Sequence, residues 1–168
     1  MESISAIMSR RSIRIFSDKP VEPHYADLLL RAAMQAPSAK NKQPWQFYVI
    51  RNRQMLNHLC EVHPYGKMLA EASFAIVVCG DKKIEALESY LLQNCSAATQ
   101  NILLAAHSYG LGSVWLGIHP REDRIDAIRE VLKMPEEIFP VSMIAIGYPG
   151  EVKLPDDRYL PERVHYVD

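Results

Sequence analysis

The chain has 168 residues, of which 48% are hydrophobic and 23% charged, and its formal net charge is −1. This length and balance exclude a disordered chain and predict a single domain over residues 1–168, while the near-neutral charge argues against nucleic acid as a partner. No apolar run approaches the about 20 residues that cross a bilayer, and the first residues lack the pattern of an export signal, so we expect a cytoplasmic protein with no membrane partner.

The first half of the chain predicts one helix and two strands. Apolar residues between Tyr25 and Ala36 recur at the spacing of one helix face, and Pro37 ends that pattern. Residues 45–50 are aromatic and β-branched and therefore predict a strand. Residues 73–79, with three β-branched residues at their centre, predict a second strand.

The longest helical pattern runs from Ile84 to Tyr109. Gly110 follows it, and glycine is the residue that most readily takes the positive φ needed at the end of a helix. The middle of this segment, residues 95–98, consists of small side chains that allow another helix to approach closely. We therefore expect a helix in the core or across a dimer interface.

Two further strands are predicted at residues 112–118 and 141–147. They flank a helix of about 12 residues that begins near Arg121. The layout predicts an α+β fold in which helices cover a sheet.

Arg10, Arg11, Ser12 and Arg14 form the first cluster with chemical interest. Guanidinium groups match phosphate oxygens in charge and geometry. In an extended stretch residues 10, 12 and 14 point to the same side, which would put two cations and a hydroxyl on one face. A solvated basic turn is the other interpretation of the same cluster.

A polar loop at residues 37–44 forms the second cluster. It lies between a proline that ends a helix and a proline that precedes a strand, and loops held at both ends often carry binding groups. Its mixture of amide, hydroxyl and small apolar side chains suits an aromatic heterocycle with a polar edge, although an ordinary capped loop would have a similar composition.

In this order the two clusters resemble the amino-terminal signature of the nitroreductase family. The matching segments are RRSIRIF at 10–16, APS at 36–38 and NKQPW at 41–45. The resemblance continues through KML at 67–69, GLGSVWLG at 110–117 and IGYP at 146–149, so it spans nearly the whole chain.

The resemblance implies a three-layer α+β fold with a mostly antiparallel sheet, and an intertwined homodimer that binds FMN where the subunits meet. Arg10 and Ser12 would hold the phosphate, and Arg11 would contribute charge or backbone. Arg14 and Lys67 would lie by the flavin pyrimidine, where a fixed cation favours the reduced, anionic ring.

The resemblance also implies contacts from other parts of the chain. A loop of the second subunit would touch the flavin through Pro37, Ser38, Ala39 and Asn41. The backbone around Leu116 and Gly117 would approach the ring, because glycine admits close main-chain contact. A basic residue near the carboxy terminus would complete the phosphate site, with Arg158 as the first candidate and Arg163 and Lys153 as competitors.

The activity implied is that of an FMN-dependent oxidoreductase. NADH or NADPH would pass hydride to flavin N5 in a ping-pong reaction, and a small oxidised acceptor such as a nitroaromatic, a quinone or free flavin would follow. Because the cofactor performs the difficult chemistry, no side chain is assigned as a catalytic acid or base. A non-catalytic flavin-binding or storage protein is the alternative, and reactions of reduced FMN with oxygen or halogenated substrates rank lower.

Other chemistries find little support in the sequence. Gly110 and Gly112 lack the third glycine of a dinucleotide fingerprint, and they follow a helix where the fingerprint requires a strand. The six histidines and three cysteines show no metal-ligand or disulfide spacing, so no metal site is expected. Ser38 lacks the motif of a nucleophilic serine.

Overall fold

The computed structural model describes residues 2–167, so Met1 and Asp168, the two ends of the expected 1–168 domain, lie outside the described residues. The helices are α1 (Ser3–Ser9), α2 (His24–Ala33), α3 (Arg53–Val62), α4 (Glu88–Ser108) and α5 (Glu122–Leu132). The strands are β1 (Trp45–Ile50), β2 (Phe74–Asp81), β3 (Gly112–Gly117) and β4 (Ile138–Gly147). Short 3-10 helices are η1 (Ala39–Asn41), η2 (Lys67–Ala70) and η3 (Pro161–Arg163).

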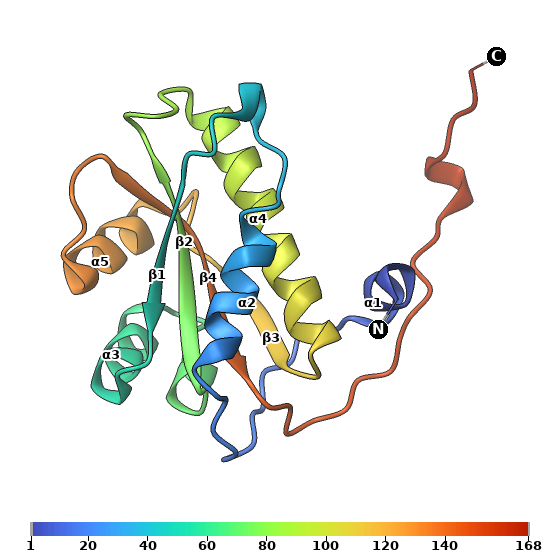
Figure 1. Ribbon diagram of the computed structural model, residues 1–168, viewed down its shortest axis with the longest axis horizontal. Helices are drawn as coiled ribbons and strands as arrows, with labels where there is room; N and C mark the ends of the chain where they lie inside the picture. The colour runs from blue at the N-terminus through green and yellow to red at the C-terminus, as the bar shows by residue number, and fades with distance from the viewer. Residues whose placement is uncertain (1, 168) are drawn as a thin grey trace.

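The strands form one antiparallel sheet in the order β1-β2-β4-β3. Every residue of β4 is buried, so the sheet is covered on both faces. On one face α4 packs against β2, β4 and β3 and carries α2 on its outer side, while α5 packs against β4 and contacts α3. This helix–sheet–helix arrangement is visible in Figure 1 and confirms the expected three-layer α+β fold.

Helix α4 lies directly on β2. A Cβ atom added to Gly80 would come within 2.2 Å of the side chain of Leu91, so the glycine is what lets the helix approach. Cys95 and Ala98, two of the small residues predicted to allow close packing, are fully buried in this core. The long helix thus serves as the scaffold to which the candidate site is attached.

Several predicted boundaries need correction. The helix expected to run to Ala36 ends at Ala33, because the next turn tightens through bonds from the Gln35 and Ala36 amides to the carbonyls of Ala32 and Ala33. The helix expected from Ile84 begins only at Glu88. By contrast, the strand at 45–50 and the positive φ of Gly110, 76°, are confirmed.

Two further differences have clear local causes. Strand β4 begins at Ile138, three residues before the predicted start, and includes Pro140 because a bulge follows it: Val78 of β2 pairs with Ser142 and Cys79 pairs with Pro140, which leaves Val141 of β4 as the extra residue. Helix α3 was not predicted at all. Its start carries the ordinary signal of a capping asparagine, since the Asn52 side chain accepts a hydrogen bond from the Met55 amide at 2.9 Å.

The carboxy-terminal tail, residues 151–167, leaves the sheet and passes beside α1 before it extends away from the body of the molecule (Figure 1). Both segments expose large apolar side chains: Ile4, Ile7, Met8, Val152, Leu154, Tyr159, Tyr166 and Val167.

Among residues 2–167, no helix combines the length and apolar character needed to cross a membrane.

Candidate functional site

Arg10 and Arg158 come from opposite ends of the chain and lie close together. Arg10 follows α1 directly and is partly buried. Burial, followed by the nearby charges of Arg11 and Arg158, lowers the pKa of Arg10. The gathering of like charges at a partly buried position is typical of a site that binds an anion.

These arginines border a pocket of about 320 Å³ between α1 and the tail. Its lining comprises Ile7, Met8, Arg10, Arg11, Asp156, Asp157, Arg158 and Tyr159. The pocket therefore combines three cations with an apolar wall from α1, and two acidic residues of the tail, Asp156 and Asp157, also line it.

Arg11 binds the tail to the amino-terminal segment. Its guanidinium donates to the carbonyl oxygens of Leu154 and Asp156, both at 3.1 Å, and to the carbonyl oxygen of Arg10 at 2.8 Å. These donors are thus engaged with backbone, and the positive charge remains next to Arg10. The contribution of Arg11 to a phosphate site through its charge or its backbone stays a prediction.

Ser12 and Arg14 lie in an extended segment beside β3. Ser12 forms a bridge with Ser113, and the amide of Arg14 donates to Glu151 Oε1 at 2.6 Å. The Arg14 side chain is exposed. Lys153, one of the competing phosphate ligands, donates to the Ser12 carbonyl at 2.9 Å and pairs with Glu151 at 3.0 Å.

Gly117 ends β3, and its carbonyl oxygen is held from two sides. His63 Nε2 lies 3.0 Å from it, and Arg124 Nη1 donates to it at 2.9 Å. A Cβ added to Gly117 would meet no atom of the described chain closer than the His119 oxygen at 4.0 Å. The neighbouring Leu116 is buried and pairs with Met143 in the sheet.

His63 also anchors the turn that leads to Lys67. Its Nδ1 accepts a hydrogen bond from the Tyr65 amide at 3.2 Å, which leaves the proton on Nε2 to be donated to Gly117. Burial is the main cause that lowers the pKa of His63, and the neutral ring suits both bonds. Lys67 itself is exposed at the start of η2. A buried imidazole therefore connects two predicted flavin-contacting segments, Lys67 and Leu116–Gly117.

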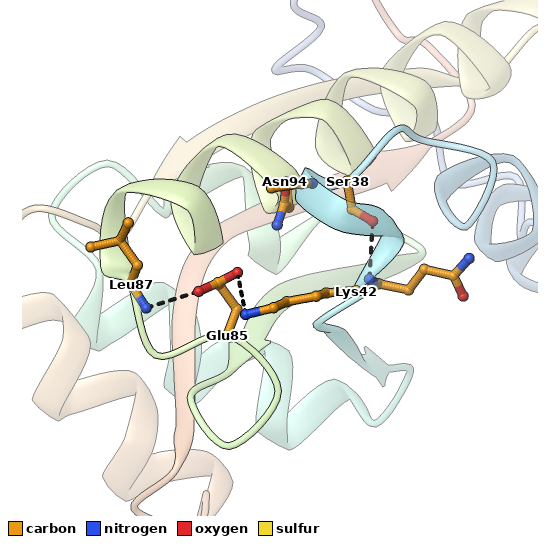
Figure 2. Close-up of polar contacts among 7 residues, drawn as sticks. Ser38, Lys42, Glu85, Leu87 and Asn94 are labelled. Atoms are coloured by element: carbon orange, nitrogen blue, oxygen red, sulfur yellow. Dashed lines mark hydrogen bonds and ion pairs between the residues drawn. The ribbon is translucent and has the colours of Figure 1, made fainter.

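The loop formed by residues 38–43 has an unusual backbone. Lys40, Asn41 and Gln43 have φ values of 55°, 54° and 50°. Ser38 Oγ accepts from the Gln43 amide at 3.0 Å, and the Ala39 amide donates to Asn94 Oδ1 at 3.0 Å (Figure 2). The loop is therefore fastened to the amino-terminal part of α4, while Pro37 and Asn41 are exposed.

The arginine cluster lies near the other end of the same helix. Ser9 Oγ is 2.7 Å from His107 Nε2, and the charge of Arg10 contributes to lowering the pKa of His107 after burial, its main cause. Asn94 and His107 are 13 positions apart, which corresponds to roughly 20 Å along a helix at about 1.5 Å per residue. Within one chain, the two clusters that sequence analysis singled out are thus separated, as Figure 1 illustrates.

Sequence reasoning missed the residues that hold these segments in place. His63 and Arg124 fix the Gly117 carbonyl, and Asn94 and Glu85 contact the loop 38–43. Each acts on a segment distant in the sequence, and no local motif marks them.

Comparisons with known proteins agree with the motif resemblance. A family model described as the nitroreductase family matches residues 7–62 and 53–148. A protein of Methanothermobacter thermautotrophicus, named as a candidate NADH dehydrogenase/NAD(P)H nitroreductase, is 48% identical over 165 residues, which are 98% of this chain and 86% of that protein.

Two solved structures are similar over nearly their whole length. A candidate NADH dehydrogenase/NAD(P)H nitroreductase from Parabacteroides distasonis is 40% identical with a TM-score of 0.94, covering 98% of this chain and 96% of that one. A candidate nitroreductase from Desulfovibrio desulfuricans, solved in complex with FMN, is 32% identical with a TM-score of 0.87, covering 100% and 98% of the two chains.

Proposed function

The chain belongs to the nitroreductase family, and from this premise we propose that it is an NAD(P)H-dependent oxidoreductase that uses FMN and works as a homodimer. The name of the similar Methanothermobacter protein supports the nicotinamide donor, and the FMN complex of the Desulfovibrio protein supports the cofactor.

The residues at the chain ends fit the phosphate of FMN. Burial and the neighbouring cations lower the pKa of Arg10, and a bound anion would offset the repulsion among these like charges. Arg10 and Ser12 would donate to the phosphate oxygens, with Arg11 adding charge. Arg158 is supported as the tail residue of this site because its charge acts on Arg10, whereas Lys153 is engaged with Ser12 and Glu151.

The other residues fit the ring of the flavin. Arg14 and Lys67 both carry exposed cationic side chains that would stabilise negative charge on the pyrimidine side. Leu116 and Gly117 would offer backbone to the ring, and the open space beside Gly117 supports a close approach. When bound, FMN would supply the redox chemistry that passes hydride from NADH or NADPH to a second substrate.

A second copy of the chain would complete the site. The loop with Pro37, Ser38, Ala39 and Asn41 is held near the end of α4 opposite to Arg10, which supports the proposal that the loop of one subunit touches the flavin held by the other. The apolar side chains exposed on α1 and the tail provide a surface for the partner to cover. A flavin-loaded protein that elutes as a stable monomer in size-exclusion chromatography would contradict this arrangement.

The protein groups in this reaction bind and orient. We propose a ping-pong sequence in which the oxidised nicotinamide leaves before the acceptor enters, with nitroaromatics, quinones and free flavins as the acceptor class. No side chain is required as a catalytic acid or base.

The observation that carries the proposal is that Arg10, Arg11 and Arg158 line one pocket between α1 and the tail. The test is the absorbance spectrum of purified protein before and after anaerobic addition of NADH or NADPH. We expect a bound-flavin spectrum that is bleached by one or both donors. A flavin spectrum that neither donor bleaches would favour the storage protein instead, and intact protein that refuses FMN at saturating concentration would overturn the cofactor assignment.

A further inference from the structure

The loop 38–43 keeps a backbone conformation that its own residues disfavour. Positive φ brings the Cβ of an L-residue too close to the backbone, and only glycine, and to a lesser degree asparagine, tolerates it readily. Here Lys40 and Gln43 take it as well as Asn41. Such positions persist only where the surroundings hold them, and they gather at ligand-binding segments.

Glu85 supplies one of these constraints from beneath the loop. Its side chain is 4% exposed, and Oε2 lies 2.9 Å from Lys42 Nζ. Its other oxygen, Oε1, accepts from the Leu87 amide at 3.0 Å, just before α4 begins. Figure 2 shows the Lys42 side chain extended under the loop to meet this carboxylate. Both carboxylate oxygens of Glu85 thus have a partner, and the one that faces the loop holds Lys42, which lies between two residues with positive φ.

Asn94 supplies the second constraint. Its side chain is buried, Oδ1 accepts from the Ala39 amide, and Nδ2 has no hydrogen-bond partner among the described residues. The hydrogen bond from the Ala39 backbone amide therefore determines the orientation of the Asn94 side-chain amide. Glu85 and Asn94 together fasten the loop at Ala39 and at Lys42, on either side of its strained residues.

The loop and its ion pair both reduce the stability that the fold could have. The buried Glu85 carboxylate loses hydration free energy that the ion pair with Lys42 only partly replaces, and the positive φ values add conformational strain. The arrangement makes physical sense if the exact course of the loop matters for binding. The exposed side chains of Lys40, Asn41 and Gln43 show that the loop presents polar groups outward.

We propose that Glu85 is a positioning residue, which acts through Lys42 to hold the loop 38–43 in the conformation that contacts FMN. Asn94 supports it from the Ala39 side. This inference rests on the proposed function, in which the loop of one subunit touches the flavin bound by the other.

The test compares variants of the ion pair in the full-length protein. Glu85→Gln and Lys42→Met each remove the pair, and Lys42→Arg keeps the charge. The matched control is Glu137→Gln, which removes the ion pair between Glu137 and Lys83, a pair that involves the same turn before α4 but not the loop. FMN affinity, KM and kcat for NAD(P)H, and hydrogen exchange of the Ala39–Gln43 amides are measured for each protein.

We expect Glu85→Gln and Lys42→Met to raise the FMN Kd about tenfold, a change of about 1.4 kcal/mol, and to speed exchange at the loop amides. With FMN saturating, kcat should change less than the FMN Kd, because the hydride-transfer groups remain. Lys42→Arg should keep most of the wild-type affinity. The double variant Glu85→Gln with Lys42→Met should bind FMN no more weakly than the weaker of the two single variants, since both changes break the same interaction.

The outcomes separate the two proposals. Wild-type protein that binds no FMN overturns the proposed function. Wild-type protein that binds FMN, together with Glu85→Gln and Lys42→Met variants that bind it equally well, overturns the positioning role alone. An equal loss in Glu137→Gln would also overturn it, since the effect would then follow from general destabilisation. If Glu85→Gln does not fold, Lys42→Met decides the matter, because its side chain is 36% exposed.

Discussion

The Nε2 atom of His63 lies 3.0 Å from the carbonyl oxygen of Gly117, so a buried imidazole joins the turn before Lys67 to the end of β3. Nδ1 of the same ring accepts the Tyr65 amide, and both ring nitrogens are therefore used in the neutral form. Protonation would turn the accepting nitrogen into a donor that faces another donor. The connection between these two segments consequently depends on the charge state of one histidine.

The free energy of unfolding should therefore fall in mildly acidic solution. Burial lowers the pKa of His63 in the folded state, so the unfolded chain, with a histidine pKa of about 6.5, binds the proton more readily. His63 thus contributes stability that is complete above about pH 6.5 and is lost as the pH falls from there towards the lower, folded pKa. His107, whose pKa is also lowered, acts in the same direction.

Urea unfolding at several pH values between about 5 and 8 checks this expectation. His63→Gln should be less stable at neutral pH, since one or both hydrogen bonds are lost, and should show a shallower decline below about pH 6.5. A variant with the same pH dependence as the wild type would contradict the role given to His63.

Replacement of Arg10 by alanine should weaken FMN binding. The loss of a charge-assisted hydrogen bond, about 1.5–3 kcal/mol, corresponds to a rise in Kd of about 10-fold to 100-fold. Titration of the FMN-free protein with FMN, followed by fluorescence quenching, measures it. Arg121→Ala is the matched control, because that exposed guanidinium pairs with Asp123 on α5 and should leave the Kd unchanged.

The three basic residues of the tail should differ in their effects. Arg158→Ala should weaken FMN binding more than Arg163→Ala or Lys153→Met, since Arg158 is the tail cation whose charge acts on Arg10. Lys153→Met should instead loosen the tail through its bonds to Ser12 and Glu151. Parallel measurements of FMN affinity and thermal stability distinguish the two effects, and a larger affinity loss in Arg163→Ala would reassign the phosphate ligand.

Two glycines should respond in opposite ways to alanine. Gly80→Ala would force a Cβ to within 2.2 Å of Leu91 and should destabilise the fold by about 1–3 kcal/mol, the usual cost of overpacking. Gly117→Ala meets no such contact, so its Tm should stay near that of the wild type while FMN binding or reduction is impaired by crowding of the ring. Wild-type flavin affinity and reduction rate in Gly117→Ala would argue against a flavin at this strand end.

The sequence predicts well those elements whose ends are marked locally. Strand β1 begins after Pro44 and ends before Asn52, and its predicted and observed bounds agree. Gly110 similarly marks the end of α4. The start of β4 escaped prediction because Pro140 reads as a break in a strand, whereas the structure keeps it in the ladder beside a bulge at Val141, which depends on pairing with β2, about 60 positions earlier in the chain.

The same distinction holds for the candidate site. The arginines at 10–14 and the loop at 37–44 are short patterns whose residue types already indicate anion and ring binding. Arg10 and Arg158 line one pocket although much of the chain separates them, and the ion pair of Lys42 with Glu85 spans two strands and a helix. Residue type alone does not reveal such neighbours, because the chain has 19 basic and 20 acidic residues that could occupy each place.

The inner position of β4 in the sheet has a consequence for biosynthesis. This strand follows β2 and β3 in the chain yet lies between them, so neither has its neighbour on that side until residue 147 has emerged from the ribosome. The apolar edges of both strands are open to other chains during that interval. The yield of active protein should therefore respond to translation speed and chaperone supply while residues 82–147 are made, well before any flavin can be bound.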